Sequence, residues 1–254
     1  MANLAGRTCL ITGASSGLGT HFARLISSAG ARVALAARRK EKVEKLAREL
    51  RALGVEAVAV AMDVADEQSV IAGFDAAEAA LGTIDTVIAN AGISSPGRST
   101  DVPAAALAGI LDTNVLGVFL TAREGAKRMF AAGSRESGVG RILLIGSMGA
   151  DVPIKGEVMY CATKAAVANM GRNLAGEWLR SGVNVNAIQP GFILTEMAGE
   201  WFSSEGGKAQ IAGFPRKRLQ PIESLDQMVL HLCSDASSAM TGSVITIDDG
   251  QSLQ

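Results

Sequence analysis

Residues 7–19 read RTCLITGASSGLG, and this stretch decides the fold. Its first half, Arg7–Thr12, is an apolar run that predicts a buried strand. Glycines follow at Gly13, Gly17 and Gly19, after which apolar side chains recur at helical spacing. An isolated glycine cluster is weak evidence for nucleotide binding, because glycines also close ordinary turns. A buried strand that passes through such a cluster into a helix is the arrangement that holds a dinucleotide pyrophosphate.

Each part of this motif has an expected task. Gly13 makes the tight turn, Gly17 lets the backbone approach the pyrophosphate, and Gly19 lets the helix pack closely on the strand. The helix N-terminus presents unpaired N–H groups and the positive end of its dipole to the phosphates. The residues between the glycines are also predicted to contact the cofactor: Ser15, Ser16 and Leu18.

Apolar strands alternate with helical patterns along the whole chain. The expected strands are residues 7–12, 32–37, 55–62, 84–89, 141–145, 183–188 and 243–248, and two long helices are expected over 111–129 and 158–180. Continuous apolar strands separated by helices form a parallel sheet that is covered on both faces. The sequence therefore predicts an α/β fold, a Rossmann-like doubly wound parallel sheet of about seven strands with helices on both faces, as one domain over residues 1–254.

One segment interrupts this alternation. Residues 196–221 have weak periodicity, several glycines and scattered aromatic side chains. Loops of this length inside a compact domain are usually functional lids or disordered segments. We therefore expect a loop that contributes to the substrate site.

The composition excludes several classes of protein. The 254 residues are 48% hydrophobic and 19% charged, with a mean hydropathy of +0.25 and a formal net charge of -1. We therefore expect neither disorder nor a nucleic-acid surface. Uncharged stretches are shorter than the roughly 18 apolar residues that cross a bilayer, and the start of the chain shows no signal-peptide pattern. Three separated cysteines and two histidines predict no disulfide and no metal site. A cytoplasmic protein without a membrane partner is expected.

The end of the second predicted strand indicates the cofactor. An acidic residue there would hold a ribose diol and repel a 2′-phosphate. The chain has Arg38 and Arg39 instead, so NADP(H) is favoured and NAD(H) stays open, with Arg38 as the main 2′-phosphate ligand. A solvated basic start to the next helix is the alternative. Asp63 and Val64, after the third strand, are also predicted cofactor contacts, although Asp63 suits a helix cap as well.

Tyr160 is the only tyrosine of the chain, and it precedes Lys164 by four residues within a predicted helix. Side chains at this spacing share a helix face, so the ammonium is expected beside the phenol, where it lowers the phenol pKa. The attraction is worth at most about 4 kcal/mol, and burial of the phenolate opposes it. Ser147 at a strand end and Asn114 in a helical stretch complete the candidate set. A cap and a packed polar residue are their simpler interpretations.

Together these residues resemble the short-chain dehydrogenase/reductase family over nearly the whole chain. The family's glycine motif corresponds to residues 12–19, TGASSGLG. Its catalytic positions correspond to Asn114, Ser147, Tyr160 and Lys164. Its other cofactor positions correspond to Asn90, Ala91, Gly92, Pro190, Gly191, Ile193 and Thr195, together with Tyr160 and Lys164. The chain departs from the family pattern at Ala89, where Asn is more usual, and at Asp249, where Gly is more usual.

The resemblance implies hydride transfer between a nicotinamide and a carbonyl or carbinol carbon. Ser147 would orient the substrate oxygen, and Tyr160 would deliver or accept the proton. Lys164 would lower the phenol pKa and bind ribose hydroxyls, Asn114 would hold a relay water, and Thr195 would bind the carboxamide. The family typically assembles through its two long helices and its last strand, so a homotetramer or homodimer is expected.

The predicted substrate pocket is mostly apolar. It combines residues 94–96, the segment that follows Ser147 and the 196–221 loop: Ser147, Met148, Ala150, Val152, Ile154, Tyr160, Met197, Trp201, Phe202 and Phe214. A hydrophobic ketone or secondary alcohol is the expected small-molecule substrate. The alternative is that several of these aromatic side chains only pack the loop or a subunit interface.

Three other functions stay open. A 3-oxoacyl-[acyl-carrier-protein] reductase would need a basic rim, for which Lys127, Arg128 and Arg172 are available, but Gly176 stands where such reductases usually have arginine. An NAD-dependent secondary alcohol dehydrogenase is disfavoured by the arginines after the second strand. A catalytically silent nucleotide-binding scaffold, a different class of protein, would have no need of the tyrosine–lysine pair.

Overall fold

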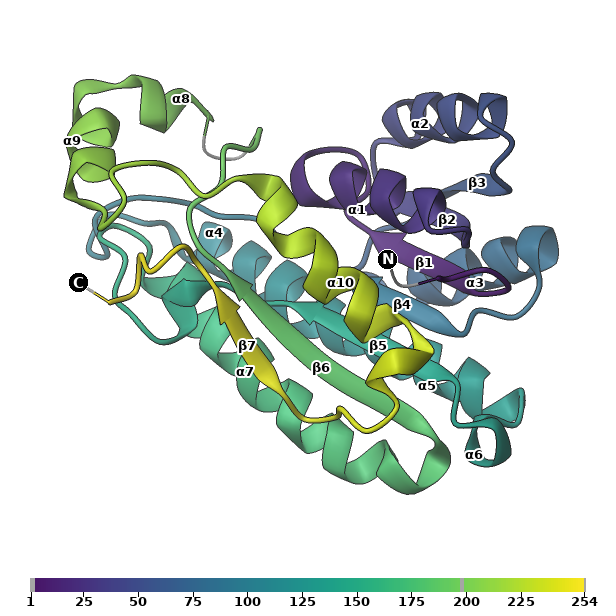
Figure 1. Ribbon diagram of the computed structural model, residues 1–254. Helices are drawn as coiled ribbons and strands as arrows, with labels where there is room; N and C mark the ends of the chain where they lie inside the picture. Colours follow the sequence, from purple (N-terminus) through teal and green to yellow (C-terminus); the bar gives the residue numbers. More distant parts are fainter. Residues whose placement is uncertain (1–2, 197–198, 254) are drawn as a thin grey trace.

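The computed structural model describes residues 3–196 and 199–253. At its centre is a seven-stranded parallel sheet in the order β3-β2-β1-β4-β5-β6-β7 (Figure 1). The strands are β1 (Thr8–Thr12), β2 (Arg32–Ala37), β3 (Ala57–Ala61), β4 (Thr86–Ala89), β5 (Gly140–Ile145), β6 (Val183–Pro190) and β7 (Val244–Ile247). Every expected strand is present, and the predicted doubly wound α/β fold is confirmed.

Helices cover both faces of this sheet. One face carries α1 (Gly17–Ser28), α2 (Lys40–Ala52) and α10 (Asp226–Cys233), and the other carries α3 (Glu67–Leu81), α5 (Gly117–Ala131) and α7 (Val158–Trp178). A short α6 (Ser134–Ser137) and four 3₁₀ turns complete the connections: Met148–Ala150, Leu179–Ser181, Ile222–Leu225 and Asp235–Ser237. All residues of β1, β4, β5 and β6 are buried, which fits the mostly apolar sequences of β1, β4 and β5. In β6 the buried amides of Asn184 and Asn186 donate to the carbonyl oxygens of Ser238 and Met240.

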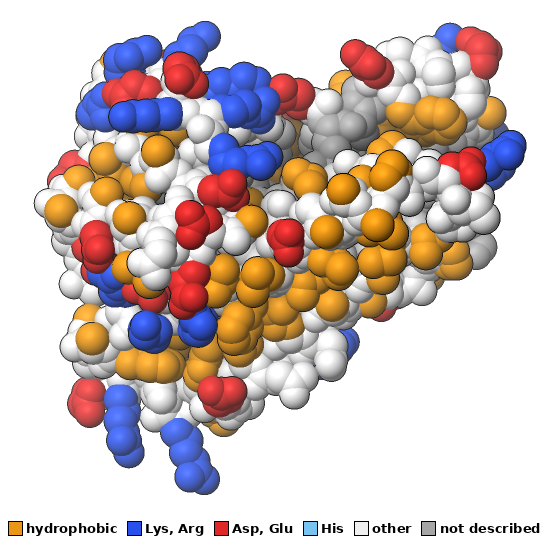
Figure 2. Space-filling model, turned by 180° about the vertical axis from the view of Figure 1, so that it is seen from behind, with side chains coloured by type: hydrophobic (Ala, Val, Ile, Leu, Met, Phe, Trp, Pro, Cys, Tyr) orange, Lys and Arg blue, Asp and Glu red, His pale blue; other side chains and the backbone are white. Residues whose placement is uncertain are grey.

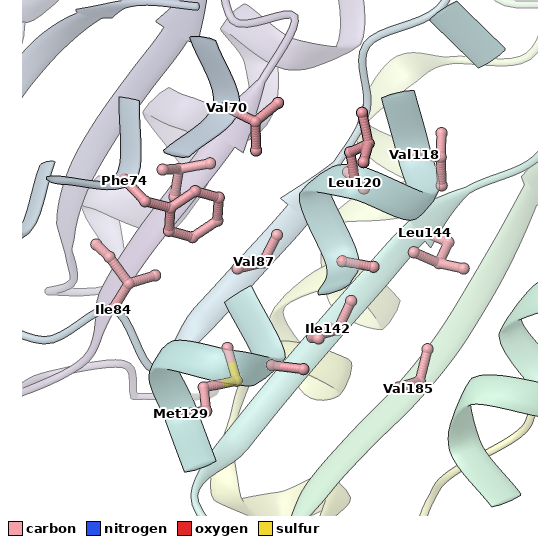
Figure 3. Packing of buried hydrophobic residues seen from close by; sticks show 14 of the residues in the cluster. Val70, Phe74, Ile84, Val87, Val118, Leu120, Met129, Ile142, Leu144 and Val185 are labelled. Atoms are coloured by element: carbon pink, nitrogen blue, oxygen red, sulfur yellow. The ribbon is translucent and has the colours of Figure 1, made fainter. Parts of the chain in front are cut away.

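Figure 3 shows the core between the sheet and the helices α3 and α5. Phe74 from α3 and Met129 from α5 lie over Val87 and Ile142 of the central strands, and all four side chains are buried. Gly125 allows α5 to approach β4 closely, because a Cβ at this position would lie 2.7 Å from Val87 Cγ2. This packing anchors the helix that follows the Asn114 segment.

The helix predicted over residues 111–129 starts earlier and is interrupted. α4 (Ala104–Leu111) is followed by a π-helical turn over Asp112–Leu116, and α5 continues from there. The early start follows from Pro103, whose φ of -64° suits a helix N-cap, and from the alanine-rich sequence after it. The π-helical turn contains Asn114, and such turns are frequent at functional sites.

The combined helical run Ala104–Ala131 is long and apolar enough to cross a membrane by length and composition alone. Core helices of soluble proteins pass the same test, so one helix of this kind is weak support for a membrane span.

The segment 196–221 differs from the expected irregular loop because much of it is helical. α8 (Gly199–Ser203) and α9 (Glu205–Gly213) occupy it. The Ser204 hydroxyl caps α9 by accepting a hydrogen bond from Gly207 N–H at 3.1 Å. Glycine is required at this corner, since a Cβ on Gly207 would lie 2.1 Å from the Trp201 carbonyl oxygen. Two short, glycine-containing helices leave little periodicity in the sequence.

The strand order reverses between β1 and β4, where the chain passes from one half of the sheet to the other. In parallel α/β sheets, ligands bind at this point, outside the carboxyl ends of the strands. The glycine turn after β1 and Asn90 after β4 meet there. A Cβ on Gly19 would lie 2.2 Å from the Gly13 carbonyl oxygen, so the predicted close packing of helix and strand is present in the structure.

We expect Gly19→Ala to lower the free energy of unfolding by about 2 kcal/mol, because the helix or the turn must shift to admit a methyl group. Gly176→Ala in α7 is the matched control. Nothing lies within 4 Å of a Cβ at Gly176, so its higher helix propensity should raise the free energy of unfolding by about 0.5–1 kcal/mol. Urea unfolding measures both, and equal effects of the two substitutions would contradict the close approach.

Candidate active site

A cavity of about 1020 Å³ opens at the carboxyl edge of the sheet, where the strand order reverses. Every residue predicted for cofactor binding lines it except Gly19, whose contacts lie within the protein. Five other predicted site residues do not line this cavity, and a sixth, Met197, is outside the described residues. Asn114 lies behind its wall, Val152 and Phe214 line a neighbouring cavity of about 390 Å³, and Ser95 and Ala150 line neither cavity.

The glycine turn presents backbone rather than side chains to this cavity. Gly13 and Gly17 have φ of +66° and +52°, the left-handed region that glycine tolerates best. Ser16 stands at the N-cap of α1 without a capping hydrogen bond from its side chain, and the first turn contains no acidic residue. The first N–H groups of α1 are therefore available to an anion, and the dipole of the helix favours one. This cradle fits the pyrophosphate of a dinucleotide.

Asn90, which follows β4, stabilises the glycine turn through hydrogen bonds. Its Nδ2 donates to the Thr12 carbonyl oxygen at 2.9 Å, and the Asn90 and Ala91 N–H groups both donate to Thr12 Oγ1 at 3.1 Å. A Cβ on Gly13 would lie 2.9 Å from Ala91 Cα. The Asn-Ala-Gly element therefore holds the glycine turn in place, whatever else it contacts.

The two arginines that directly follow β2 have different contacts. Arg38 lines the cavity, is exposed, and has no side-chain partner among the described residues. Arg39 donates to the hydroxyls of Ser15 and Ser16 and pairs with Glu196. The sequence pattern missed Glu196, because an ion pair between segments this far apart leaves no periodic signal.

Asp63 makes a local contact as well as lining the cavity. Its Oδ1 accepts a hydrogen bond from Ala65 N–H at 3.1 Å. The cap of α3 is Asp66, which accepts from Gln68 N–H at 2.9 Å, so the alternative that Asp63 caps this helix is wrong.

Ser147, Tyr160 and Lys164 come together at the floor of the cavity. Tyr160 and Lys164 lie on α7, with Lys164 Nζ 5.5 Å from the centre of the phenol ring. Lys164 is buried and donates to the Ile145 carbonyl oxygen at 2.8 Å. The Ser147 hydroxyl hydrogen-bonds the phenol and accepts from Gly149 N–H at 3.1 Å. A strand end and one helix face thus supply a hydroxyl, a phenol and an ammonium to one place.

The structure corrects the expected pKa of Tyr160. Burial raises the pKa of the phenol to about 12, and the hydrogen bond from Ser147 opposes this shift only in part. Burial also lowers the pKa of Lys164 to about 8. The pair shares a helix face as predicted, but loss of hydration outweighs the attraction in this protein. A phenol with this pKa keeps its proton at neutral pH and is able to donate it.

Asn114 is fully buried beside this group. Its Oδ1 accepts from Ile93 N–H at 2.8 Å, and its Nδ2 donates to the Ile93 carbonyl oxygen at 2.9 Å and to Thr163 Oγ1 at 3.2 Å. A Cβ on Gly92 would lie 3.5 Å from Asn114 Oδ1 and 3.6 Å from Lys164 Nζ, so both atoms border the same small space.

The substrate end of the cavity has an apolar wall and a polar wall. Phe192, which the sequence pattern missed, stacks on Phe214 with ring centres 5.4 Å apart, and Trp201 faces the cavity from α8. On the polar side, the Ser94 hydroxyl donates to both carboxylate oxygens of Glu157, at 2.7 and 2.6 Å. Burial raises the pKa of Glu157, and the hydrogen bond from Ser94 opposes the shift.

Asp249 stands where the family more usually has Gly, and the C-terminal turn is nevertheless formed. Asp249 adopts a φ of +56°, a conformation that glycine takes more readily. Its carboxylate accepts from Arg218 Nε at 2.8 Å and pairs with Arg216 Nε at 3.1 Å. The neighbouring Gln251 accepts from Phe192 N–H at 2.7 Å, which ties this turn to the apolar wall.

Residues 7–206 match the family model described as short chain dehydrogenase. The chain is a short-chain dehydrogenase/reductase. The family is therefore the one that the sequence motifs resembled.

Relatives of this short-chain dehydrogenase/reductase match it along nearly their whole length. Cis-4-hydroxycyclohexanecarboxylate dehydrogenase of Sinomonas cyclohexanicum is 34% identical, over 97% of this chain and 96% of that protein. The solved gluconate 5-dehydrogenase of Burkholderia cenocepacia J2315, in complex with NADP and tartrate, has a TM-score of 0.92 at 30% identity, over 99% and 97% of the two chains.

A third comparison differs in cofactor. The 3-ketoacyl-(acyl-carrier-protein) reductase of Brucella melitensis, complexed with NADH, has a TM-score of 0.88 at 31% identity, over 98% of this chain and 100% of that chain. This protein is thus an oxidoreductase that acts on CH–OH groups with a nicotinamide cofactor, within a family whose members were crystallised with NADP or NADH.

We expect Lys164→Met to raise the free energy of unfolding by about 1–3 kcal/mol near neutral pH, because it removes a buried charge whose one hydrogen-bond acceptor among the described residues is the Ile145 carbonyl oxygen. The folded-state pKa is about 8 against an ordinary 10.5. The wild-type penalty is therefore complete below pH 8, and it declines as pH rises through the interval between these two values.

Unfolding by urea near neutral pH and at about pH 9.5 measures this gain and its decline. Lys45→Met is the matched control, since Lys45 is exposed on α2 and should show neither effect. A Lys164→Met variant that is less stable than the wild type at neutral pH would contradict the unfavourable burial of this ammonium.

Proposed function

We propose that this short-chain dehydrogenase/reductase is an NADP(H)-dependent enzyme that interconverts a hydrophobic ketone and the corresponding secondary alcohol, with reduction as its main direction. The observation that carries the proposal is the meeting of Ser147, Tyr160 and Lys164 at the floor of the large cavity, beside a backbone cradle that fits a dinucleotide. A silent scaffold would have no need of a buried ammonium, which costs stability.

Each residue of this group has a distinct role in the proposed reaction. The nicotinamide cofactor supplies the hydride. The Ser147 hydroxyl orients the carbonyl oxygen, and Tyr160 donates its proton to that oxygen as the alcohol forms. Because the pKa of Tyr160 is about 12, the phenol keeps this proton at neutral pH until it is transferred to the carbonyl oxygen. The Lys164 ammonium stabilises the resulting phenolate from the same helix face.

The preference for NADP(H) rests on the residues after β2. The exposed Arg38 lines the cavity with its guanidinium unpaired among the described residues, and no carboxylate follows the strand directly to hold a ribose diol. A guanidinium is well suited to a phosphate because it donates two parallel hydrogen bonds.

The substrate body is proposed to be apolar and cyclic. Phe192, Phe202 and Trp201 form one wall of the substrate end, and an apolar ring fits against such a wall. The relative from Sinomonas cyclohexanicum is named for a hydroxycyclohexanecarboxylate, which supports a six-membered ring in the substrate. The Ser94–Glu157 pair, which also lines the cavity, favours a substrate hydroxyl beside it and disfavours a substrate carboxylate at that position.

A 3-oxoacyl-[acyl-carrier-protein] reductase receives less support. Arg128, which the basic rim would need, is engaged by Asp75, Glu78 and Glu124 at 2.8–2.9 Å. Lys127 also pairs with Glu124, at 3.5 Å. Of the three basic residues considered, Arg172 alone has no ion pair among the described residues, which leaves little unpaired positive charge for an acidic carrier.

We also propose that the enzyme assembles as a homodimer or homotetramer. Leu111, Leu116 and Val158 are exposed on the α4–α5 and α7 side. Figure 2, which views the molecule from behind, shows a band of hydrophobic side chains across this face. A second copy of the chain is the occupant that the family resemblance suggests, and burial of the band would remove apolar surface from water.

Tyr160→Phe should lower kcat for reduction of a substituted cyclohexanone by about 10²–10⁴-fold, because the phenol proton is lost. The Kd for NADPH should stay within about twofold, since the ring remains in place. Consumption of NADPH measures the rate, and a panel of aryl, aliphatic and cyclic ketones with a 3-oxoacyl thioester defines the substrate class. Preference for the thioester would overturn the hydrophobic-ketone proposal. Full activity of the variant would overturn the proposed role of Tyr160.

Arg38→Asp should weaken NADPH binding by about 10- to 100-fold and strengthen NADH binding, since a carboxylate there repels a 2′-phosphate and holds a diol. Lys40→Asp is the matched charge reversal: Lys40 is exposed at the start of α2 and does not line the cavity. Cofactor Kd values from fluorescence titration provide the measurement. An unchanged NADPH/NADH ratio in Arg38→Asp would show that another residue recognises the phosphate.

A further inference from the structure

A carboxylate already occupies the basic site at the mouth of the cofactor cavity. Glu196 Oε1 lies 2.9 Å from Arg39 Nη1 and 3.0 Å from Lys42 Nζ. Its second oxygen, Oε2, lies 3.4 Å from each of Arg39 Nη2 and Lys42 Nζ. Two cations from the start of α2 therefore converge on one anion that is distant in sequence.

Hydroxyl groups of the glycine turn complete this donor set. Arg39 Nη2 donates to Ser16 Oγ at 2.7 Å and to Ser15 Oγ at 3.0 Å, and Ser16 also hydrogen-bonds Glu196. A guanidinium, an ammonium and a serine hydroxyl are the groups that proteins use to bind a phosphate. The carboxylate of Glu196 is held by the same groups. These hydrogen bonds and cations lower the pKa of Glu196 to about 2, so the carboxylate stays ionised at neutral pH.

The position of this anion coincides with the expected place of the 2′-phosphate. In doubly wound folds that bind dinucleotides, the end of β2 lies at the adenosine ribose and discriminates between a 2′-hydroxyl and a 2′-phosphate. Arg39 directly follows Arg38 at that point, and Glu196, Arg39 and Arg38 all line the cavity. Lys42 lies one helical turn further along α2.

We propose that Glu196 competes with the 2′-phosphate of the cofactor for Arg39 and Lys42, and so sets how strongly this enzyme prefers NADP(H) over NAD(H). The inference rests on the proposed binding of a nicotinamide cofactor in this cavity. NADP(H) must displace the carboxylate to use the two cations. Before it does so, Arg38 is the one arginine after β2 that lines the cavity without a partner among the described residues. NAD(H) carries no 2′-phosphate, so it binds without disturbing Glu196.

The strength of the ion pairs suits such a competition. The side chains of Arg39, Lys42 and Glu196 are 45%, 48% and 52% exposed, and ion pairs in contact with water are weak. A phosphate with about two negative charges can therefore replace a carboxylate with one. The competition lowers the affinity for NADP(H) without abolishing it.

The test compares Glu196→Gln with the wild type, using 2′,5′-ADP and 5′-AMP as probes in isothermal titration calorimetry on the full-length protein. Gln keeps the shape of the side chain and removes its charge. We expect 2′,5′-ADP to bind about five- to tenfold more tightly to Glu196→Gln, and 5′-AMP to change by less than about twofold. The gain should shrink at high salt, because exposed charges are screened.

Glu200→Gln is the matched control, since Glu200 is exposed on α8 and does not line the cavity. It should change neither Kd. Lys42→Met should weaken 2′,5′-ADP binding more in the Glu196→Gln background than in the wild type, because the phosphate competes with the Glu196 carboxylate for Lys42 only in the wild type. Equal gains for both probes, no gain for 2′,5′-ADP, or the same gain in Glu200→Gln would overturn the inference.

Failure of the proposed cofactor preference gives a different result. If the wild type binds 5′-AMP at least as tightly as 2′,5′-ADP, the preference for NADP(H) is wrong. A selective gain for 2′,5′-ADP in Glu196→Gln would still support the role of Glu196 under that outcome.

Discussion

The cofactor site depends on a steric constraint at the point where β1 and β4 separate. Three backbone segments meet there with no room for further side chains: Gly13 packs on Ala91, Gly19 packs on the Gly13 carbonyl, and Asn90 donates to Thr12 between them. This contact brings the glycine turn, the N-terminus of α1 and the end of β4 around one opening. The opening is lined by backbone N–H groups and a helix dipole, so it suits an anion before any side chain contributes.

The catalytic end of the same cavity shows a second constraint, which is electrostatic. Lys164 is held between the sheet and α7, where burial lowers its pKa to about 8, and Tyr160 beside it has a pKa of about 12. Near neutral pH the Lys164 shift costs folding free energy, because the lysine is charged in the unfolded state, whereas Tyr160 is neutral in both states. Functional sites commonly carry such a cost, because groups that must react cannot also be optimally solvated. The phenol of Tyr160 therefore keeps its proton near neutral pH.

One stretch of chain joins the two ends of the cavity. Phe192 contributes to the apolar wall, Thr195 lies against Gly17 at the cradle, and Glu196 pairs with the basic start of α2. Trp201 then faces the cavity from α8. The residues that we propose to select the cofactor and those that we propose to select the substrate are therefore neighbours in the sequence after β6. A substitution at one of these positions is placed to affect the other selectivity as well.

The sequence by itself determined the elements whose signals are local. Strand and helix periodicity predicted the doubly wound sheet, and spacing within one helix placed Tyr160 and Lys164 on a shared face. The Glu196–Arg39 ion pair and the helices in the 196–221 segment needed the tertiary structure, because contacts between distant segments and short capped helices leave no periodic pattern. The rise in the pKa of Tyr160 also needed it. Burial is produced by walls from several elements, and no spacing within one helix records how much water those walls exclude.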